Sequence, residues 1–390
     1  MPLPLEGFRI IDCSTVLAGP LAATHLGDFG ADVIKVELPQ ADPLPMRATR
    51  LHEERNKRSI TADLRTEEGQ DILLRLIRNA DALIENFRPG TFEKWNLGPD
   101  RLLQENPRLI IHRLSAFGQT GPWRSLGGYD RQAQAISGAT YVTGFPESEP
   151  VRSGFATADY MAGIWGAFSI LLAAYWRDAR GGTGQVSDLA LFEPMLRASE
   201  GSITEYGLSG SVRERAGNSN PGVVPASNFL TSDGVTVAIN ANNDRQWARL
   251  AGVIGRPDLA ANEDYRMPSR LKHAEEIYAL IGEWVGARDV RTVEAAMVDA
   301  GVPCAPVLNV RQIFEHPMIR GRGSIVNVPW EETDLAMVGP LPRLSASPGE
   351  IRSAAPRTGQ HTVEVLESIG FDADQIAELA ERGVIGKPQP

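Results

Sequence analysis

Residues 8–37 read FRIIDCSTVLAGPLAATHLGDFGADVIKVE, and this stretch decides the fold class. Residues 8–12 form a short apolar run typical of a buried strand, residues 20–30 have helical spacing, and residues 32–37 resemble a second strand. This order predicts a parallel sheet with a crossover helix. The loop at residues 16–20 is either an anion-binding loop at a helix N-terminus or an ordinary strand-to-helix junction, because the GxGxxG fingerprint is absent.

The alternation continues along the first half of the chain. Apolar runs at 81–85, 109–112 and 184–191 predict further strands, and Thr66 is placed to cap a helix whose apolar stripe includes Ile72 and Ile77. A helix is also expected between residues 153 and 176. After a stretch rich in Gly, Ser, Asn and Pro, a strand at 234–239 and helices at 244–254, 273–285 and 290–300 predict a second unit.

The composition limits the possible partners. The chain has 390 residues and a formal net charge of -10, which favours neither nucleic acid nor an anionic membrane surface as a partner. Two cysteines, Cys13 and Cys304, and six scattered histidines lack metal-ligand spacing, so no metal site is expected. The N-terminus lacks a signal-peptide pattern, and the apolar stretch at 164–176 is read as a core helix too short to span a bilayer. These features predict a cytoplasmic protein.

Two basic segments are candidate phosphate sites. Residues 55–65 carry four cations. One interpretation is a phosphate-binding segment, and the alternative is a solvated basic turn. The sequence Glu85-Asn-Phe-Arg-Pro-Gly90 follows a predicted strand at the sheet edge where such folds bind ligands. There Phe87 is a candidate purine contact, and Arg88 or Lys94 a candidate phosphate contact. A plain turn is the alternative for this loop.

Asp159 is the residue with the clearest chemical potential. It opens a strongly apolar helix, where an Asp is a good N-cap and needs no further role. The alternative is a nucleophile, because a carboxylate attacks a thioester to give a mixed anhydride, and a helix start would keep it ionised. An earlier segment, Gly128-Tyr-Asp130, carries a second carboxylate.

Taken in order, these segments resemble the class III CoA-transferases, the CaiB/BaiF-type family that includes formyl-CoA:oxalate and carnitine CoA-transferases. The resemblance covers nearly the whole chain, and it rests on an ordered set of motifs: Val16-Leu-Ala-Gly-Pro20, Gly30-Ala-Asp-Val-Ile-Lys-Val-Glu37, Asn56-Lys-Arg-Ser-Ile60, Glu85-Asn-Phe-Arg-Pro-Gly90, Phe117-Gly-Gln-Thr-Gly-Pro122, Thr157-Ala-Asp159, Leu191-Phe-Glu193, Gly301-Val-Pro-Cys304 and Gly359-Gln-His-Thr362.

The resemblance implies roles for individual residues. Asp159 matches the family's nucleophilic aspartate, Asp130 an acidic active-site residue, and Tyr129 a neighbouring tyrosine. The residues implied to bind coenzyme A are Val16 in a contacting loop, Leu64, Arg65, Asn86 and Phe87 around the adenine, and Arg88 and Lys94 near the phosphates.

The resemblance also implies an α/β architecture. A Rossmann-like large domain is expected from both ends of the chain (1–205 and 329–390), with linkers at 206–226 and 304–328 and a smaller α+β domain at 227–303. Two chains are expected to interlock as a homodimer. Leu17 replaces a glutamine of the oxalate enzyme, so oxalate is not the expected substrate. Leu38 stands where that enzyme has an arginine, which weakens one phosphate contact, and no glycine run follows Gly222, so the mobile glycine loop of that enzyme is not expected.

The predicted activity is CoA transfer from an acyl-CoA donor to a small carboxylic acid, through an aspartyl anhydride and an aspartyl-CoA thioester. Coenzyme A enters as a thioester substrate, and no permanently bound cofactor is expected. Backbone N–H groups around Gly138 are the suggested oxyanion donors. One alternative is an α-methylacyl-CoA racemase, although Tyr129 stands where those enzymes have a histidine base. The other is a CoA-binding protein without catalysis. Succinate, hydroxy acids and betaines are all plausible acids.

Overall fold

The computed structural model describes residues 2–39 and 47–387, and these form two compact units. The first unit comprises Met1–Thr140, Arg152–Leu208 and Arg322–Pro390, and the second comprises Tyr141–Val151 and Ser209–Gly321. Tyr141–Val151 therefore lies with the second unit, although it falls inside the segment 1–205 that was expected to form one piece. The C-terminal residues lie in the same unit as the N-terminal ones.

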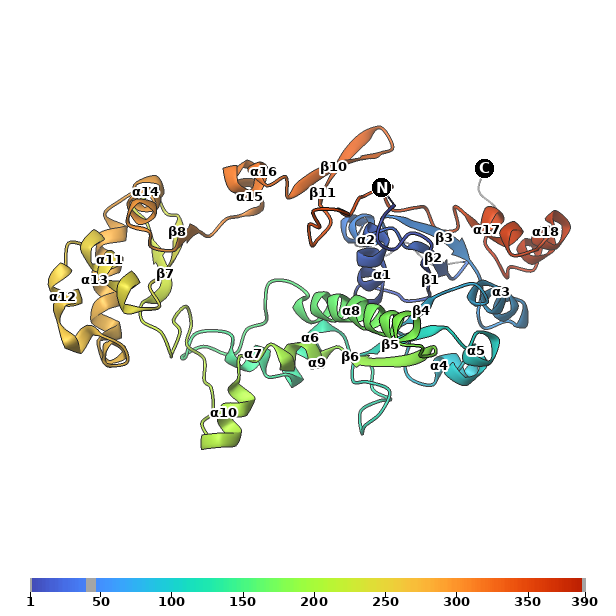
Figure 1. Ribbon diagram of the computed structural model, residues 1–390, viewed down its shortest axis with the longest axis horizontal. Helices are drawn as coiled ribbons and strands as arrows, with labels where there is room; N and C mark the ends of the chain where they lie inside the picture. Colours follow the sequence, from blue (N-terminus) through green and yellow to red (C-terminus); the bar gives the residue numbers. More distant parts are fainter. Residues whose placement is uncertain (1, 40–46, 388–390) are drawn as a thin grey trace. The chain divides into compact units, whose positions relative to one another are not determined.

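A six-stranded parallel sheet organises the first unit, with strand order β3-β2-β1-β4-β5-β6 (Figure 1). Its strands are β1 (Arg9–Asp12), β2 (Asp32–Glu37), β3 (Lys57–Thr61), β4 (Ala82–Glu85), β5 (Ile110–Ser115) and β6 (Gln185–Ala190). This is the order of doubly wound Rossmann folds, which bind ligands beyond the carboxyl ends of the strands. The predicted α/β class with a parallel sheet is confirmed, and every strand except β3 overlaps a predicted run.

Helices cover both faces of this sheet. On one face lie α1 (Ala18–Asp28) and α8 (Thr157–Ala179), and on the other lie α3 (Glu67–Ile77), α4 (Thr91–Lys94), α5 (Pro99–Glu105), α17 (Thr362–Ser368) and α18 (Ala373–Glu381). Figure 1 shows α17 and α18, in red, next to the blue N-terminal elements. The predicted cap is confirmed, because Thr66 Oγ1 accepts a hydrogen bond of 3.1 Å from the Gly69 N–H at the start of α3. The other elements of this unit are α2 (Arg47–Glu53), α6 (Asp130–Ile136), α9 (Phe192–Arg197), β10 (Ile325–Trp330) and β11 (Thr333–Val338).

The second unit has its own core. Its antiparallel sheet is packed against four helices, and the elements are β7 (Ala226–Leu230), β8 (Thr236–Asn240), β9 (Cys304–Pro306), α11 (Asp244–Val253), α12 (Pro257–Ala261), α13 (Ala274–Gly286) and α14 (Val290–Ala300). The predicted helices at 244–254, 273–285 and 290–300 are confirmed. The segment expected to be a linker at 304–328 contains β9, α15 (Val310–Glu315) and α16 (Pro317–Gly321), while α7 (Ala139–Val142) and α10 (Ser202–Ser209) cross the unit boundaries.

Most of the basic run at 55–65 is not a solvated turn, although Arg65 at its end lies on the surface. Residues 57–61 form the edge strand β3, and Arg55 and Lys57 are buried against carboxylates from neighbouring elements. Arg55 pairs with Asp28 at 2.7 Å, and Lys57 pairs with Asp12 at 3.0 Å. A buried cation persists only when it is paired in this way. The sequence pattern hid the strand because Ile60 is its one apolar residue, and its other buried positions are occupied by Lys57, Ser59 and Thr61.

Helix α8 begins near Asp159 and packs against the sheet. It runs for 23 residues and is long and apolar enough to cross a membrane by length and composition, so the expectation that the stretch is too short was wrong. Its inner side packs on α1 and β5 through glycines. A Cβ added at Gly163 would lie 2.7 Å from Leu21, and one at Gly166 would lie 2.7 Å from His112.

Candidate active site

A cavity of about 570 Å³ lies at the carboxyl ends of the strands in the first unit, the edge that doubly wound folds use for ligands. Asp159 from the first turn of α8 lines it. The other walls come from the loop after β1, the loop after β4, the end of β5 and the loop before α6. Six of the predicted site residues meet here: Val16, Asn86, Phe87, Arg88, Tyr129 and Asp159.

Asp159 is the only carboxylate among the described residues that line this cavity. Burial, and then the charge of Asp130, raise its pKa to about 7. It is the third residue of α8 and accepts no capping bond, since the N-cap position is Ala156. Both parts of the sequence-based interpretation are therefore corrected: Asp159 is not the N-cap, and its surroundings oppose ionisation more than the helix start favours it.

Asp130 provides the cap that was expected from Asp159. It is only 7% exposed, and its Oδ1 accepts a hydrogen bond of 2.9 Å from the Ala158 N–H in the first turn of α8. Its Oδ2 accepts from Gln134 Nε2 at 2.7 Å. Asp130 does not line the cavity, so the structure places it behind Asp159 as the group that orients the helix start and repels the Asp159 charge.

Tyr129, next to Asp130 in the sequence, lines the cavity. Its side chain is 69% exposed, and its backbone N–H donates to Gln132 Oε1 at 3.0 Å. An exposed phenol of this kind is free to contact a ligand.

Asn86 does not have a free amide. Its Oδ1 accepts from the Thr15 N–H and its Nδ2 donates to the Thr15 carbonyl, both at 2.7 Å. The side chain implied to contact adenine is therefore bound to the loop that contains Val16. Phe87, the next residue, stacks on Phe92 with ring centroids 5.6 Å apart.

A smaller cavity of about 190 Å³ shares Thr15, Val16 and Phe87 with the first. It is lined by the predicted Leu64 and by apolar groups such as Trp95. Charged residues that sequence reasoning missed as a site also line it, and Arg50 with Glu37 forms an ion pair of 2.9 Å there. No local pattern marks Arg50, because its relation to Glu37 depends on the packing of α2 against the sheet.

Of the three basic residues predicted to bind coenzyme A, only Arg88 lines a cavity next to Asp159. Arg88 is the only cation among the described residues lining the larger cavity. Arg65 pairs with Asp63 at 2.7 Å on the surface and, like Lys94 at the end of α4, lines neither cavity.

The suggested oxyanion donors at Gly138 are wrong for this cavity. The Gly138 N–H donates to the Ala135 carbonyl at 3.2 Å, and Gly138 does not line the cavity. Leu17 and Ala18, at the start of α1, do line it. The first N–H groups of a helix have no intrahelical acceptor, so this start offers donors next to Asp159.

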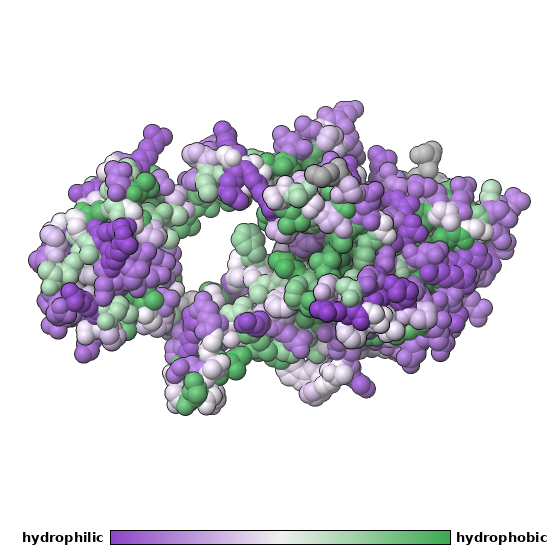
Figure 2. Space-filling model, in the orientation of Figure 1, coloured by the Kyte–Doolittle hydropathy of each residue, from purple (hydrophilic) through white to green (hydrophobic). Residues whose placement is uncertain are grey.

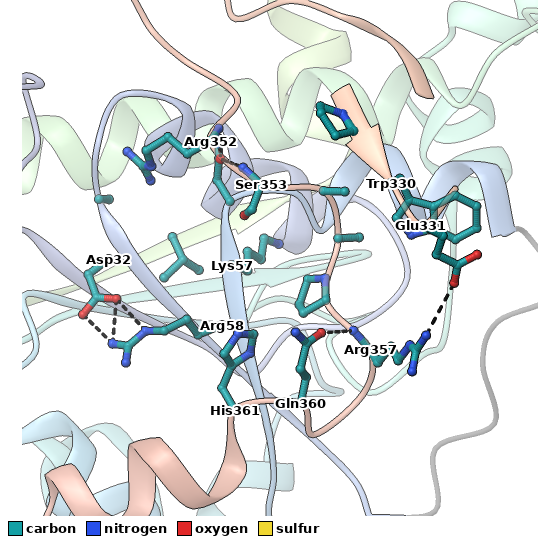
Figure 3. Close-up of a pocket in the computed structure, with 17 residues that line it drawn as sticks. Asp32, Lys57, Arg58, Trp330, Glu331, Arg352, Ser353, Arg357, Gln360 and His361 are labelled. Carbon is teal, nitrogen blue, oxygen red and sulfur yellow. Dashed lines mark hydrogen bonds and ion pairs between the residues drawn. The ribbon is translucent and has the colours of Figure 1, made fainter. Parts of the chain in front are cut away.

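A third cavity, of about 620 Å³, lies along the edge strand β3 and is lined by none of the predicted site residues (Figure 3). Several of its cations already have partners within the chain: Arg58 pairs with Asp32 at 2.8 Å, Arg357 pairs with Glu331 at 3.7 Å, and Arg352 donates to the Gly27 carbonyl. The functional site is therefore assigned to the cavity around Asp159, where a carboxylate with a perturbed pKa faces a ligand-sized space. Within residues 2–39 and 47–387, no cluster of three or more His, Cys, Asp or Glu side chains is placed to hold a metal ion.

Comparisons with known proteins identify the family of the chain. The model of CoA-transferase family III matches residues 5–362. A succinyl-CoA–L-malate CoA-transferase beta subunit of Chloroflexus aurantiacus is 40% identical, over 98% of both chains. A succinyl-CoA–D-citramalate CoA-transferase of the same organism is 38% identical over 98% of both chains, and a succinate–glutarate CoA-transferase of Agrobacterium fabrum is 34% identical over 94% of this chain and 96% of its own. Among solved structures, a CaiB/BaiF family protein from Brucella suis has a TM-score of 0.84 at 32% identity, covering 95% of this chain and all (100%) of its own.

Proposed function

We propose that this chain, which belongs to CoA-transferase family III, carries coenzyme A between two carboxylic acids on the side chain of Asp159. The chain is a CoA-transferase by family and by its relatives; the covalent route and the roles of the residues are the proposal. The observation that carries it is a single carboxylate, with its pKa raised to about 7, in a cavity at the ligand-binding edge of the sheet.

The proposed reaction begins when Asp159 attacks the carbonyl of the acyl-CoA. This forms an acyl–aspartyl anhydride and releases the CoA thiolate. The thiolate attacks the Asp159 carbonyl, which frees the donor acid and leaves an aspartyl-CoA thioester. The acceptor carboxylate attacks this thioester to form a new anhydride, and the returning thiolate releases the new acyl-CoA and restores the carboxylate.

The raised pKa suits this nucleophile. A carboxylate that is poorly stabilised by its surroundings is more basic and attacks more readily than a solvated one, and it is ionised above pH 7. The site must also exclude water, because both the anhydride and the thioester hydrolyse.

Negative charge that develops during these steps needs donors, and we assign them to the start of α1. The N–H groups of Leu17 and Ala18 border the cavity and lie at the positive end of the helix. Each well-placed donor of this kind contributes roughly 3 kcal/mol to a transition state that bears an oxyanion.

The two neighbouring cavities, which share Thr15, Val16 and Phe87, suit the two ends of coenzyme A. The smaller one, with Leu64 and Trp95, offers an apolar surface for the adenine, while the larger one holds the acyl group at Asp159. Val16 and Phe87 border both and would contact the pantetheine arm between them. Arg65 and Lys94, outside both cavities, remain candidates for the phosphates at the entrance.

The acids are proposed to be dicarboxylic. The relatives act, by their names, on succinyl-CoA, malate, citramalate and glutarate, and Arg88 is the one cation lining the described cavity with Asp159. A guanidinium binds a second carboxylate well. We therefore assign Arg88 to the distal carboxylate of the acid rather than to a CoA phosphate.

The proposal is tested by trapping the intermediate. After incubation with succinyl-CoA, intact-protein mass spectrometry should show a CoA adduct at Asp159, and hydroxylamine should convert this residue to a hydroxamate. Asp159→Asn should abolish exchange and the adduct, whereas Asp178→Asn, on the same helix but outside the cavity, should retain both. Near-native turnover of Asp159→Asn, or deuterium uptake at the α-carbon without CoA exchange, contradicts the proposal.

A stability measurement separates the nucleophile from a structural role. The pKa of Asp159 is higher in the folded protein than in the unfolded chain. Between about pH 4 and pH 7 the unfolded chain therefore loses this proton while the folded protein keeps it, and the free energy of unfolding falls as the pH rises. The neutral Asp159→Asn should therefore melt higher than the wild type at pH 8 and equally at pH 4. A lower melting temperature at pH 8 would instead indicate a structural anchor.

A further inference from the structure

The side chain of Asn86 connects two loops at the edge of the active-site cavity. It follows β4, and Thr15 follows the neighbouring parallel strand β1. Both polar atoms of the amide are bonded to one residue: Oδ1 accepts from the Thr15 N–H and Nδ2 donates to the Thr15 carbonyl, each at 2.7 Å. Two bonds to the same residue restrict its rotation more than one bond does.

The next residue, Val16, has an unfavourable backbone conformation. Its φ of 68° lies in the left-handed region, which a β-branched side chain rarely adopts. Such strain persists only where the surroundings hold the backbone in place. Asn86 holds the backbone at Thr15. Two buried charged side chains hold it at Ser14: the Ser14 N–H donates to Asp12 Oδ1 at 2.9 Å, and the Ser14 carbonyl accepts from Lys35 Nζ.

The held segment controls the shape of the site. Val16 borders both cavities, and the chain continues directly into Leu17 and Ala18 at the start of α1. A change of the Thr15–Val16 backbone would move the wall between the cavities and turn the first N–H groups of α1 away from Asp159. The two hydrogen bonds from the Asn86 amide to Thr15 hold this backbone in place.

We propose that Asn86 is a positioning residue for CoA transfer, acting through Thr15 and Val16 rather than by contact with adenine. The inference rests on the proposed function of Asp159. It distinguishes two effects on kinetics: loss of an adenine contact raises KM for the acyl-CoA and leaves kcat unchanged, whereas loss of an aligned wall lowers kcat, because transition-state contacts depend on alignment.

The first test compares two substitutions with a matched control. Asn86→Asp keeps the acceptor for the Thr15 N–H but places a carboxylate oxygen against the Thr15 carbonyl, and Asn86→Ala removes both bonds. Each should lower kcat by about 10- to 100-fold. The control, Asn106→Asp, alters an equivalent side chain whose Nδ2 donates to the Ile77 and Ala80 carbonyls far from the cavity. It should lower the melting temperature and leave kcat unchanged.

The second test is rescue of the strained residue. Glycine adopts φ 68° without a penalty, so Val16→Gly added to Asn86→Ala should recover at least about threefold in kcat. The inference is overturned if the Asn86 variants change only KM, if kcat stays within about twofold of wild type, or if Val16→Gly gives no recovery. The trapped adduct on Asp159 tests the proposed function separately, because wild-type protein must form it whatever the role of Asn86.

Discussion

Asp159 and Asp130 lie at the same helix start, and their surroundings give them different chemistry. Asp130 is buried and accepts hydrogen bonds from a backbone N–H and from Gln134, which stabilise its charge. Asp159 has fewer donors, and burial, followed by the charge of Asp130, raises its pKa to about 7. A carboxylate whose pKa is raised by its surroundings and that lines a cavity is a recurring feature of active sites.

At the residue scale, this arrangement predicts a pH profile. Because the reacting form of Asp159 is the carboxylate, kcat/KM should rise with pH through an apparent pKa of about 7 and level off above it. Asp130→Asn retains an oxygen that accepts from the Ala158 N–H and removes the repelling charge, so the rise should move to lower pH. Measurements between pH 5 and 9 with succinyl-CoA test this, with Asp178→Asn as the variant whose profile should not move. A rise that stays at the wild-type pH in Asp130→Asn would exclude the proposed repulsion.

At the element scale, the contact between α8 and its neighbours decides where Asp159 lies. The helix was predicted as a core element, but its close approach depends on glycines opposite side chains from distant segments. A Cβ at position 166 would lie 2.7 Å from His112 Nε2 and 3.2 Å from Ala22 Cβ. His112 is fully buried, and burial lowers its pKa to about 4, so it remains neutral and offers no charged partner.

Gly166→Ala should therefore reduce stability despite the better helix propensity of alanine. Overpacking of this kind costs about 1–3 kcal/mol, and kcat should fall because the start of α8 moves with the helix. Gly252→Ala is the matched control, since a Cβ at this position in the last turn of α11 would have no heavy atom within 4 Å. It should stabilise the protein by up to about 1 kcal/mol. Denaturant unfolding measures both, and a Gly166→Ala variant as stable as wild type would contradict the contact.

At the scale of the whole molecule, the outer face of α8 leaves a large apolar surface. Its exposed members are Tyr160, Ile164, Trp165, Phe168, Leu171, Leu172, Tyr175 and Trp176, and Figure 2 shows apolar surface where Figure 1 places this helix. A patch of this size on one helix favours burial against another protein surface. We propose that a second copy of the chain covers it, in the interlocked homodimer that the family resemblance implies.

This proposal predicts the mass in solution. Light scattering after size exclusion should give a dimer for the wild type at micromolar concentration. Leu172→Glu, in the centre of the apolar face, should shift the mass to the monomer or to aggregates. Val298→Glu, an isolated exposed apolar residue on α14, should leave the dimer intact. A monomeric wild type would rule out self-association through α8.

The sequence alone predicted the family, five of the six strands of the parallel sheet and the main helices of both units. Alternating apolar runs and a Thr66 cap are local patterns, and they predict strands and helices because neighbouring residues share a face. The resemblance selected Asp159. The tertiary structure decided that β3 is a strand with buried cations, that Asp130 rather than Asp159 caps α8, and that the Asn86 amide binds Thr15. These depend on pairs of residues far apart in the chain, and a local pattern carries no information about which distant charge or backbone group will be its neighbour once the sheet forms.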